Sequence, residues 1–196
     1  QIAEKAFSGH KNLVKVILPE GLKRIGQKAF DRTKALTNVN FPESLEYVDG
    51  LTATGLREVE FGTHIREIMS GSFYEGMPER LIVRGGVNGK FTDSYMSYDT
   101  PRTQKSAYFG EGMTYVVYEN TYIPKIMVLP STLKEFRLDG ASGTGTGKVK
   151  VYVAAAPGSA AWNLVSGQMS KAGMDPARQL HSYTPLKAVL RNADKL

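Results

Sequence analysis

The sequence has no cysteine, no long apolar run and few histidines, and each absence excludes a class of protein. Without cysteine there are no disulfides, no thiol chemistry and no Cys-ligated metal. No stretch reaches the roughly 18 consecutive apolar residues of a membrane-spanning helix. The three histidines, His10, His64 and His181, lie far apart without metal-ligand spacing, and there is no G-x-S-x-G motif. The sequence therefore predicts a non-enzymatic protein without cofactor, metal or membrane span.

One glycine-rich stretch comes near a phosphate-binding loop without matching it. The motif G-x-x-x-x-G-K-[ST] would need glycine at position 142 and serine or threonine at position 149. The sequence has Ser142 and Val149. We therefore expect SGTGTGKV to form a turn between strands.

What the sequence does contain is one pattern of apolar residues that recurs along the chain. Each copy begins with an apolar residue, which is followed by two apolar residues at positions two apart. A turn comes next, and after it two apolar residues stand three positions apart. The copies are LVKVILPEGLKRI at 13–25, LTNVNFPESLEYV at 36–48, LREVEFGTHIREI at 56–68 and, in part, MVLPSTLKEF at 127–136. Equivalent positions Ile2, Ile25, Val48 and Ile68 are spaced 23, 23 and 20 residues apart. A period in the twenties predicts a solenoid in which each repeat forms one coil.

The pattern also predicts how one coil is built. Val16 and Leu18 lie two apart and therefore face the same side of a short strand, which Pro19 ends. Leu22 and Ile25 then face inward from a second wall. The Ala-Phe pairs at 6–7 and 29–30 place a phenylalanine between the two walls. Since no coil can bury its apolar face alone, neighbouring coils must stack and share one core.

These motifs, I-x-x-x-A-F and L-x-x-V-x-[LF]-P-x-x-L-x-x-[IV], resemble the BspA-like leucine-rich repeats of bacterial surface proteins. The resemblance covers residues 2–83 and returns at 127–153. It implies a mostly β, right-handed leucine-rich-repeat solenoid of about six to seven coils over residues 1–153. Members of this family are commonly exported by host-associated bacteria, and some bind host proteins or other cells. The resemblance thus implies a secreted or cell-surface protein whose partner is a host or bacterial surface protein or glycan.

Residues 84–122 interrupt the repeat, and two interpretations remain open. The length suits degenerate or inserted coils, because Ile68 to Phe136 spans 68 residues, close to three periods. Alternatively the segment carries a binding loop, because seven of the ten tyrosines lie between positions 74 and 122. Tyrosine gives a large contact area at a small cost in conformational entropy. The candidate ligand-binding residues are Tyr95, Tyr98 and Tyr108.

Residues 154–196 are expected to cap the end of the solenoid. Val149, Val151 and Val153 alternate as a last strand should. Beyond them, apolar residues at helical spacing predict a helix that packs on this strand and ends at a C-cap glycine: Trp162, Val165, Met169, Ala172 and then Gly173. PLKAVLRN, from Pro185, is expected to form a second short helix.

Charge is spread unevenly along the chain. The net charge is +6, and residues 137–196 contain eight Lys and Arg against three Asp and Glu. We interpret this basic excess as a solvated outer face of the cap and expect no nucleic-acid partner, because basic and aromatic residues do not interleave. In the repeats, Lys23, Glu46 and Arg66 occupy one slot of successive coils and predict a ladder of alternating charges.

Two functions fit these features. The first is an adhesin-like surface protein that binds protein or glycan, for which the interrupted segment 84–122 would matter. The second is a structural spacer that presents another domain of a longer chain. The start at Gln1, within a repeat and without Met, suggests a mature or trimmed chain and favours an upstream neighbour.

Overall fold

The first repeat shows how the coil forms in the computed structural model, which describes residues 1–94, 104–140 and 146–184. Strand β1 (Lys15–Ile17) ends just before Leu18 and Pro19, and β2 (Arg24–Ile25) follows after a turn. Gly21 has φ +87°, a conformation that costs glycine little. Within β1, Lys15 and Ile17 are exposed, whereas Val16 is half-buried against the core.

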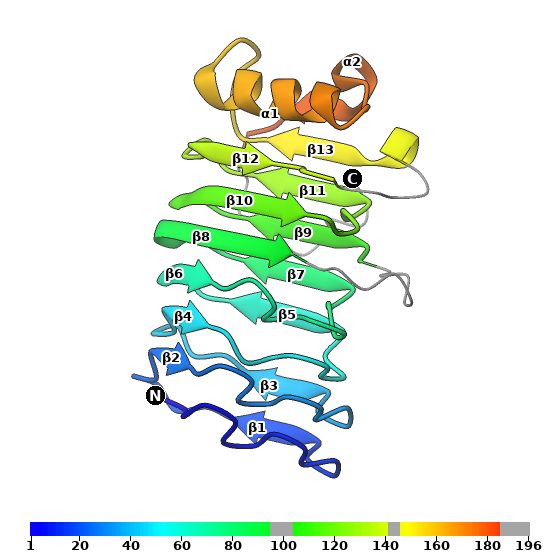
Figure 1. Cartoon of the computed structure of the whole chain (residues 1–196). Coiled ribbons are helices and arrows are strands. Elements are labelled where there is room, and N and C mark those ends of the chain that lie inside the picture. The colour runs from blue at the N-terminus through cyan, green and yellow to red at the C-terminus, as the bar shows by residue number, and fades with distance from the viewer. Residues whose placement is uncertain (95–103, 141–145, 185–196) are drawn as a thin grey trace.

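Successive coils stack these strands into two parallel walls (Figure 1). One wall has six strands, which are β2, β4 (Tyr47–Val48), β6 (Ile65–Ile68), β8 (Gly86–Ser94), β10 (Met113–Glu119) and β12 (Glu135–Arg137). The opposite wall contains β5 (Glu58–Phe61), β7 (Arg80–Val83), β9 (Ser106–Phe109), β11 (Ile126–Leu129), β13 (Lys150–Val153) and β14 (Leu180–Ser182). β1 and β3 (Asn38–Asn40) form a separate two-stranded sheet below β5. The predicted mostly β solenoid is confirmed.

A single apolar core runs between the walls. Ile25, Val48 and Ile68, the positions that define the period, are fully buried. Phe30 is also fully buried, whereas Phe7 stacks on it at 5.2 Å between ring centroids and remains 37% exposed. The predicted role of these two phenylalanines is therefore fulfilled completely by Phe30 and only partly by Phe7.

The described residues of the interrupted segment continue both walls. β8 pairs with β6 and β10, and β9 pairs with β7 and β11, all in parallel. Phe91, Phe109 and Tyr118 fill the core between them, with ring centroids 4.9 Å and 5.3 Å from Phe91. The remaining part of the interruption, 95–103, lies outside the described residues.

The C-terminal region covers the last coil with helices (Figure 1). The predicted helix is confirmed as α1 (Ala160–Lys171), with Ser159 as N-cap and Gly173 at φ +74° beyond its end. Val165 and Met169 are fully buried, but Trp162, expected to pack inward, is only half-buried. Within the stretch expected to form a turn between strands, Thr146–Lys148 is the 3₁₀ turn η1. The sequence did not predict the short α2 (Pro176–Gln179) or β14, which pairs with β13. The helix expected from Pro185 lies outside the described residues.

None of the helices in the described residues has the length and apolar character needed to cross a membrane.

Candidate functional site

Of the three tyrosines predicted to bind a ligand, the structure describes only Tyr108. Tyr95 and Tyr98 lie outside the described residues. Tyr108 points outward from β9 and is half-buried, and its hydroxyl is hydrogen-bonded to that of Tyr183. Burial raises the pKa of Tyr108, and this hydrogen bond acts in the opposite direction. The Tyr108 side chain is thus held within the molecule, and ligand binding by the three tyrosines stays a prediction.

An open feature lies elsewhere on the same side of the solenoid, where the ladder of strands breaks between β3 and β5. Among the described residues, β3 pairs only with β1, and β5 only with β7. On the opposite wall the same coils remain joined, because β4 pairs with β6. Figure 1 shows β3 and β5 set further apart than β1 and β3 or β5 and β7. Two sheet edges therefore face one another.

The space between these edges is a groove of about 390 Å³, which we call the β3–β5 groove. It is lined by Thr37, Asn38, Val39, Asn40, Phe41, Glu58, Glu60 and Arg84. The polar lining residues on β3 and β5 are exposed, and Val39 and Phe41 are half-buried. The groove thus has a polar rim with an apolar floor.

Main-chain groups of both edges point into the groove. The Asn38 N–H donates to the Val14 carbonyl, so in the alternating pattern of a parallel strand the next residue, Val39, directs its N–H and C=O away from β1. Similarly, the carbonyls of Arg57 and Phe61 accept from β7 and its flank, so Glu58 and Glu60 present their main-chain groups toward β3. The groove therefore exposes donors and acceptors in the arrangement that strand pairing uses.

The coils come together again at both ends of the groove. A Cβ at Gly55 would lie 2.3 Å from the Lys34 carbonyl oxygen, and one at Gly62 would lie 2.6 Å from the Glu43 carboxylate. At Gly55 the neighbour is main chain, so only glycine allows the approach, whereas at Gly62 a larger residue would displace the Glu43 carboxylate. Beside Gly62, the rings of Phe41 and Phe61 meet edge to face at 4.8 Å. The opening is thus bounded and has room for a short segment only.

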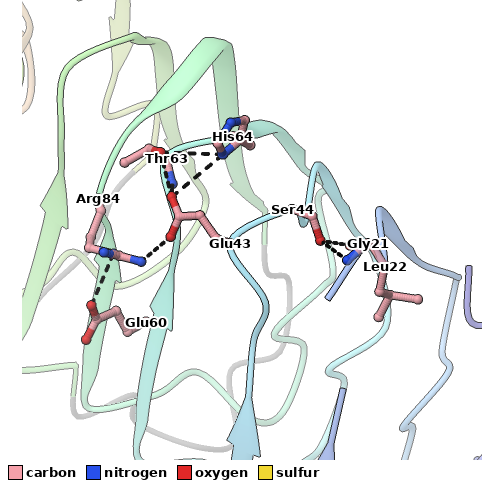
Figure 2. Close-up of polar contacts among 8 residues, drawn as sticks. All are labelled: Gly21, Leu22, Glu43, Ser44, Glu60, Thr63, His64 and Arg84. Atoms are coloured by element: carbon pink, nitrogen blue, oxygen red, sulfur yellow. Dashed lines mark hydrogen bonds and ion pairs between the residues drawn. The ribbon is translucent and has the colours of Figure 1, made fainter. Parts of the chain in front are cut away.

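A polar network centred on Glu43 closes one end (Figure 2). Its Oε1 accepts hydrogen bonds from the N–H and the hydroxyl of Thr63, at 2.7 and 2.6 Å, and lies 3.7 Å from Nδ1 of His64. Its Oε2 pairs with Arg84, whose Nε lies 3.2 Å from Glu60. The Thr63 hydroxyl is the main cause that lowers the Glu43 pKa below its ordinary value, and partial burial opposes it. The network ties three successive coils together.

The neighbouring turn has a simpler link of the same kind. The Ser44 hydroxyl accepts from the Gly21 N–H at 2.8 Å and donates to the Leu22 carbonyl at 3.0 Å (Figure 2). The side chains at 43 and 44 therefore join coils on opposite sides of their own turn.

These groups are not arranged for catalysis. The Thr63 hydroxyl donates to the carboxylate and lies 3.5 Å from the His64 ring, so the histidine does not act on a nucleophile as it does in a triad. The described residues contain no group of three His, Asp or Glu side chains that could hold a metal ion. The arrangement presents free main-chain edges and charged side chains, which suit recognition rather than reaction.

The sequence carried a signal for the groove that its interpretation did not use. Eleven positions separate Val48 from Val59, whereas fourteen separate Ile25 from Val39 and Ile2 from Val16. The arc that leads into β5 is therefore three residues shorter than the two before it. A shorter arc cannot follow the same path around the core, so β5 is displaced from the position above β3. The contact of His64 with Glu43 carried no such signal, because the two residues occupy neighbouring and not equivalent slots of their repeats.

Comparison with known proteins gives one family match, over the first part of the chain. The family model described as a BspA type leucine rich repeat region matches residues 1–88, in six copies. No curated protein and no solved structure matches the chain.

Proposed function

Because residues 1–88 match the family model of a BspA type leucine rich repeat region, we propose that the protein is a non-enzymatic, adhesin-like protein of the bacterial exterior, secreted or held at the cell surface. It binds another protein through the β3–β5 groove. Stacked repeats of this kind present long continuous surfaces, and such surfaces commonly bind partners. The fold alone does not identify the site, so the proposal depends on the groove.

The observation that supports binding is the pair of free strand edges. An extended segment can add to an exposed edge through main-chain hydrogen bonds, and its alternate side chains then supply specificity. Here Glu58 and Glu60 offer such an edge on β5, and Val39 offers one on β3. A segment of about three residues, at 3.3 Å per residue, suits an opening closed at both ends.

The side chains of the groove define the chemistry of the partner. Glu58 and Glu60 are exposed on the outer face, so lysine or arginine at the outward positions of the segment would pair with them. Each such cross-strand pair contributes about 0.2–1 kcal/mol. The half-buried Val39 favours an apolar side chain at the inward position. The expected partner is a protein with an exposed extended segment in which basic and apolar residues alternate.

A charge reversal tests this site against a matched control. Glu58→Lys with Glu60→Lys changes the rim of the groove, where the two carboxylates pair with Arg80 and Arg84 at 3.6 and 3.2 Å. The control, Glu119→Lys with Glu135→Lys, makes the same change in net charge on the opposite wall. There both carboxylates lie 3.8 Å from Arg137.

Each form is used to capture proteins from host extracellular-matrix and cell-surface extracts. We expect the wild type and the control to retain a common partner and the groove variant to lose it. Hydrogen exchange with the captured partner should then slow at the amides of residues 58 and 60. Loss after Tyr95→Ala with Tyr98→Ala instead would move the site to the tyrosine-rich segment. Capture of nothing by the wild type would contradict binding and leave the structural spacer as the function.

A further inference from the structure

A second pocket lies at the far end of the solenoid, between the start of β13 and α2. Its volume is about 560 Å³, and it is lined by Gly147, Lys148, Val149, Lys150, Asp175, Arg178 and Gln179. We call it the cap pocket. Ligand pockets of a few hundred Å³ hold small molecules or single units of a polymer.

Three positive side chains surround the cap pocket without a carboxylate partner. Lys148, Lys150 and Arg178 are exposed, and none of them forms an ion pair with a described residue. In the repeats, by contrast, a cation such as Lys23 has a carboxylate partner, Glu46, at 2.9 Å. The one carboxylate of the pocket, Asp175, accepts a hydrogen bond from the Ala177 N–H at 3.0 Å and so serves its own helix. The charge of the three cations is left for a ligand.

The wall of the pocket is fixed by Gln179. This side chain is only 6% exposed, donates to the Val149 carbonyl at 2.8 Å and accepts from the Asp175 N–H at 2.8 Å. It thereby joins β13 to α2 and holds the main chain that carries Lys148, Lys150 and Arg178. A fixed main chain removes part of the conformational entropy that would otherwise be lost when the three side chains gather around a ligand.

An aromatic surface continues from the pocket along β13. Lys150 and Tyr152 lie two residues apart and so face the same outer side of the strand. The Tyr152 ring lies 5.1 Å from the ring of His181 on β14, at an interplanar angle of 32°. Carbohydrate rings pack their C–H faces on such aromatic surfaces, while their acidic groups need cations.

We infer that the cap pocket binds an acidic carbohydrate, with the sulfate or carboxylate groups of one or two sugar units on Lys148, Lys150 and Arg178 and the adjoining sugar ring against Tyr152 and His181. The compact grouping favours a sugar unit over a nucleic acid, because a nucleic acid places its phosphates along an extended path. This site is distinct from the β3–β5 groove, so either can fail without the other.

The test compares two triple variants that remove the same charge. Lys148→Gln, Lys150→Gln and Arg178→Gln change the cap pocket. Lys11→Gln, Arg32→Gln and Lys34→Gln change a second basic cluster, near Glu75 at the other end of the molecule. Calorimetry measures binding of a heparin-derived hexasaccharide, a hyaluronan hexasaccharide that carries carboxylates only, a neutral cello-oligosaccharide and a 12-nucleotide single-stranded DNA.

We expect the wild type to bind at least one acidic hexasaccharide more tightly than the DNA and not to bind the neutral sugar. The cap-pocket variant should weaken that binding about tenfold or more, since charge-assisted hydrogen bonds are lost, while the control variant changes it less than about twofold. The preferred hexasaccharide distinguishes sulfate from carboxylate. Equal weakening in both variants would mean bulk charge only, and no binding by the wild type or tighter binding of the DNA would also overturn the proposal. Tyr152→Leu should weaken binding of the preferred sugar while leaving the cations intact.

Discussion

The coils that keep the repeat motif contain the break in the ladder, whereas the coils that lose the motif pair without one. β1 and β3 lie within residues 1–88 and have three residues each, and the two-stranded sheet that they form ends at the groove. On the same side of the solenoid, β9 belongs to the coils without the motif and pairs with β7 over four positions and with β11 over three. The motif therefore specifies which side chains enter the core, and the length of the arc specifies whether neighbouring strands meet. A regular sequence and a regular sheet are separate properties.

The largest effect on the free energy of unfolding should come from removing a buried aromatic ring, whether in a coil that keeps the motif or in one that lacks it. Phe30→Ala and Phe91→Ala each remove a fully buried ring, and each should lower the free energy of unfolding by about 3–5 kcal/mol. Denaturant unfolding of the two variants measures this. Phe7→Ala is the control, because the ring is 37% exposed and should cost much less. A small loss for Phe91→Ala would mean that the coils without the motif contribute little to the core.

Lengthening the short arc that leads into β5 should close the groove. Inserting three residues between Gly50 and Leu51 gives the third repeat the arc length of the first two. If arc length decides pairing, β5 then stacks on β3, and the amides of Val39, Glu58 and Glu60 should exchange at least about tenfold more slowly. A three-residue insertion in the turn after β12, between Asp139 and Gly140, serves as the control. Unchanged exchange at all three amides would show that the break has another cause.

These two experiments separate what the sequence predicted from what it did not. The apolar spacing predicted the walls, the core and the outward slots Lys15, Asn38 and Glu58, because inward and outward positions follow from strand periodicity. The ladder Lys23–Glu46–Arg66 is confirmed at 2.9 and 3.0 Å, since stacking places equivalent residues together. The groove depends on the path of an arc, and the cap pocket on the packing of α2 against β13, and neither follows from periodicity. The sequence predicted instead that tyrosines bind a ligand, and one of these, Tyr108, is hydrogen-bonded to Tyr183.

A smaller effect on the free energy of unfolding is expected from removing the charge of Glu43, whose network lies at one end of the groove. The pKa of Glu43 is lowered in the folded state, so its carboxylate adds stability above its ordinary pKa of 4.5 and loses that contribution as the pH falls below this value. Because the side chain is 40% exposed, solvent screening limits the contribution to about 0.5–1 kcal/mol.

The measurement is the free energy of unfolding of Glu43→Gln and of the wild type across the acidic range. Glu43→Gln should be less stable at neutral pH, and the difference should shrink as the pH falls below 4.5. Glu58→Gln is the control, because it has only a 3.6 Å contact with Arg80. A difference that does not change with pH would show that the amide fails for steric reasons and that the charge of Glu43 has no part.

The smallest effect should come from the intact wall, where Lys23, Glu46 and Arg66 form their ladder. Glu46 accepts from both neighbours, and the hydrogen bond from Lys23 is the first cause that lowers its pKa. Glu46→Lys would place three positive charges in one row, whereas Glu46→Gln removes the attraction without adding repulsion. At low ionic strength we expect the lysine variant to melt roughly 1–3 °C below the glutamine variant, and this gap should vanish in high salt because exposed charges are screened. Equal melting temperatures at low salt would mean that the paired walls, like the open groove, owe their order to packing and main-chain bonds alone.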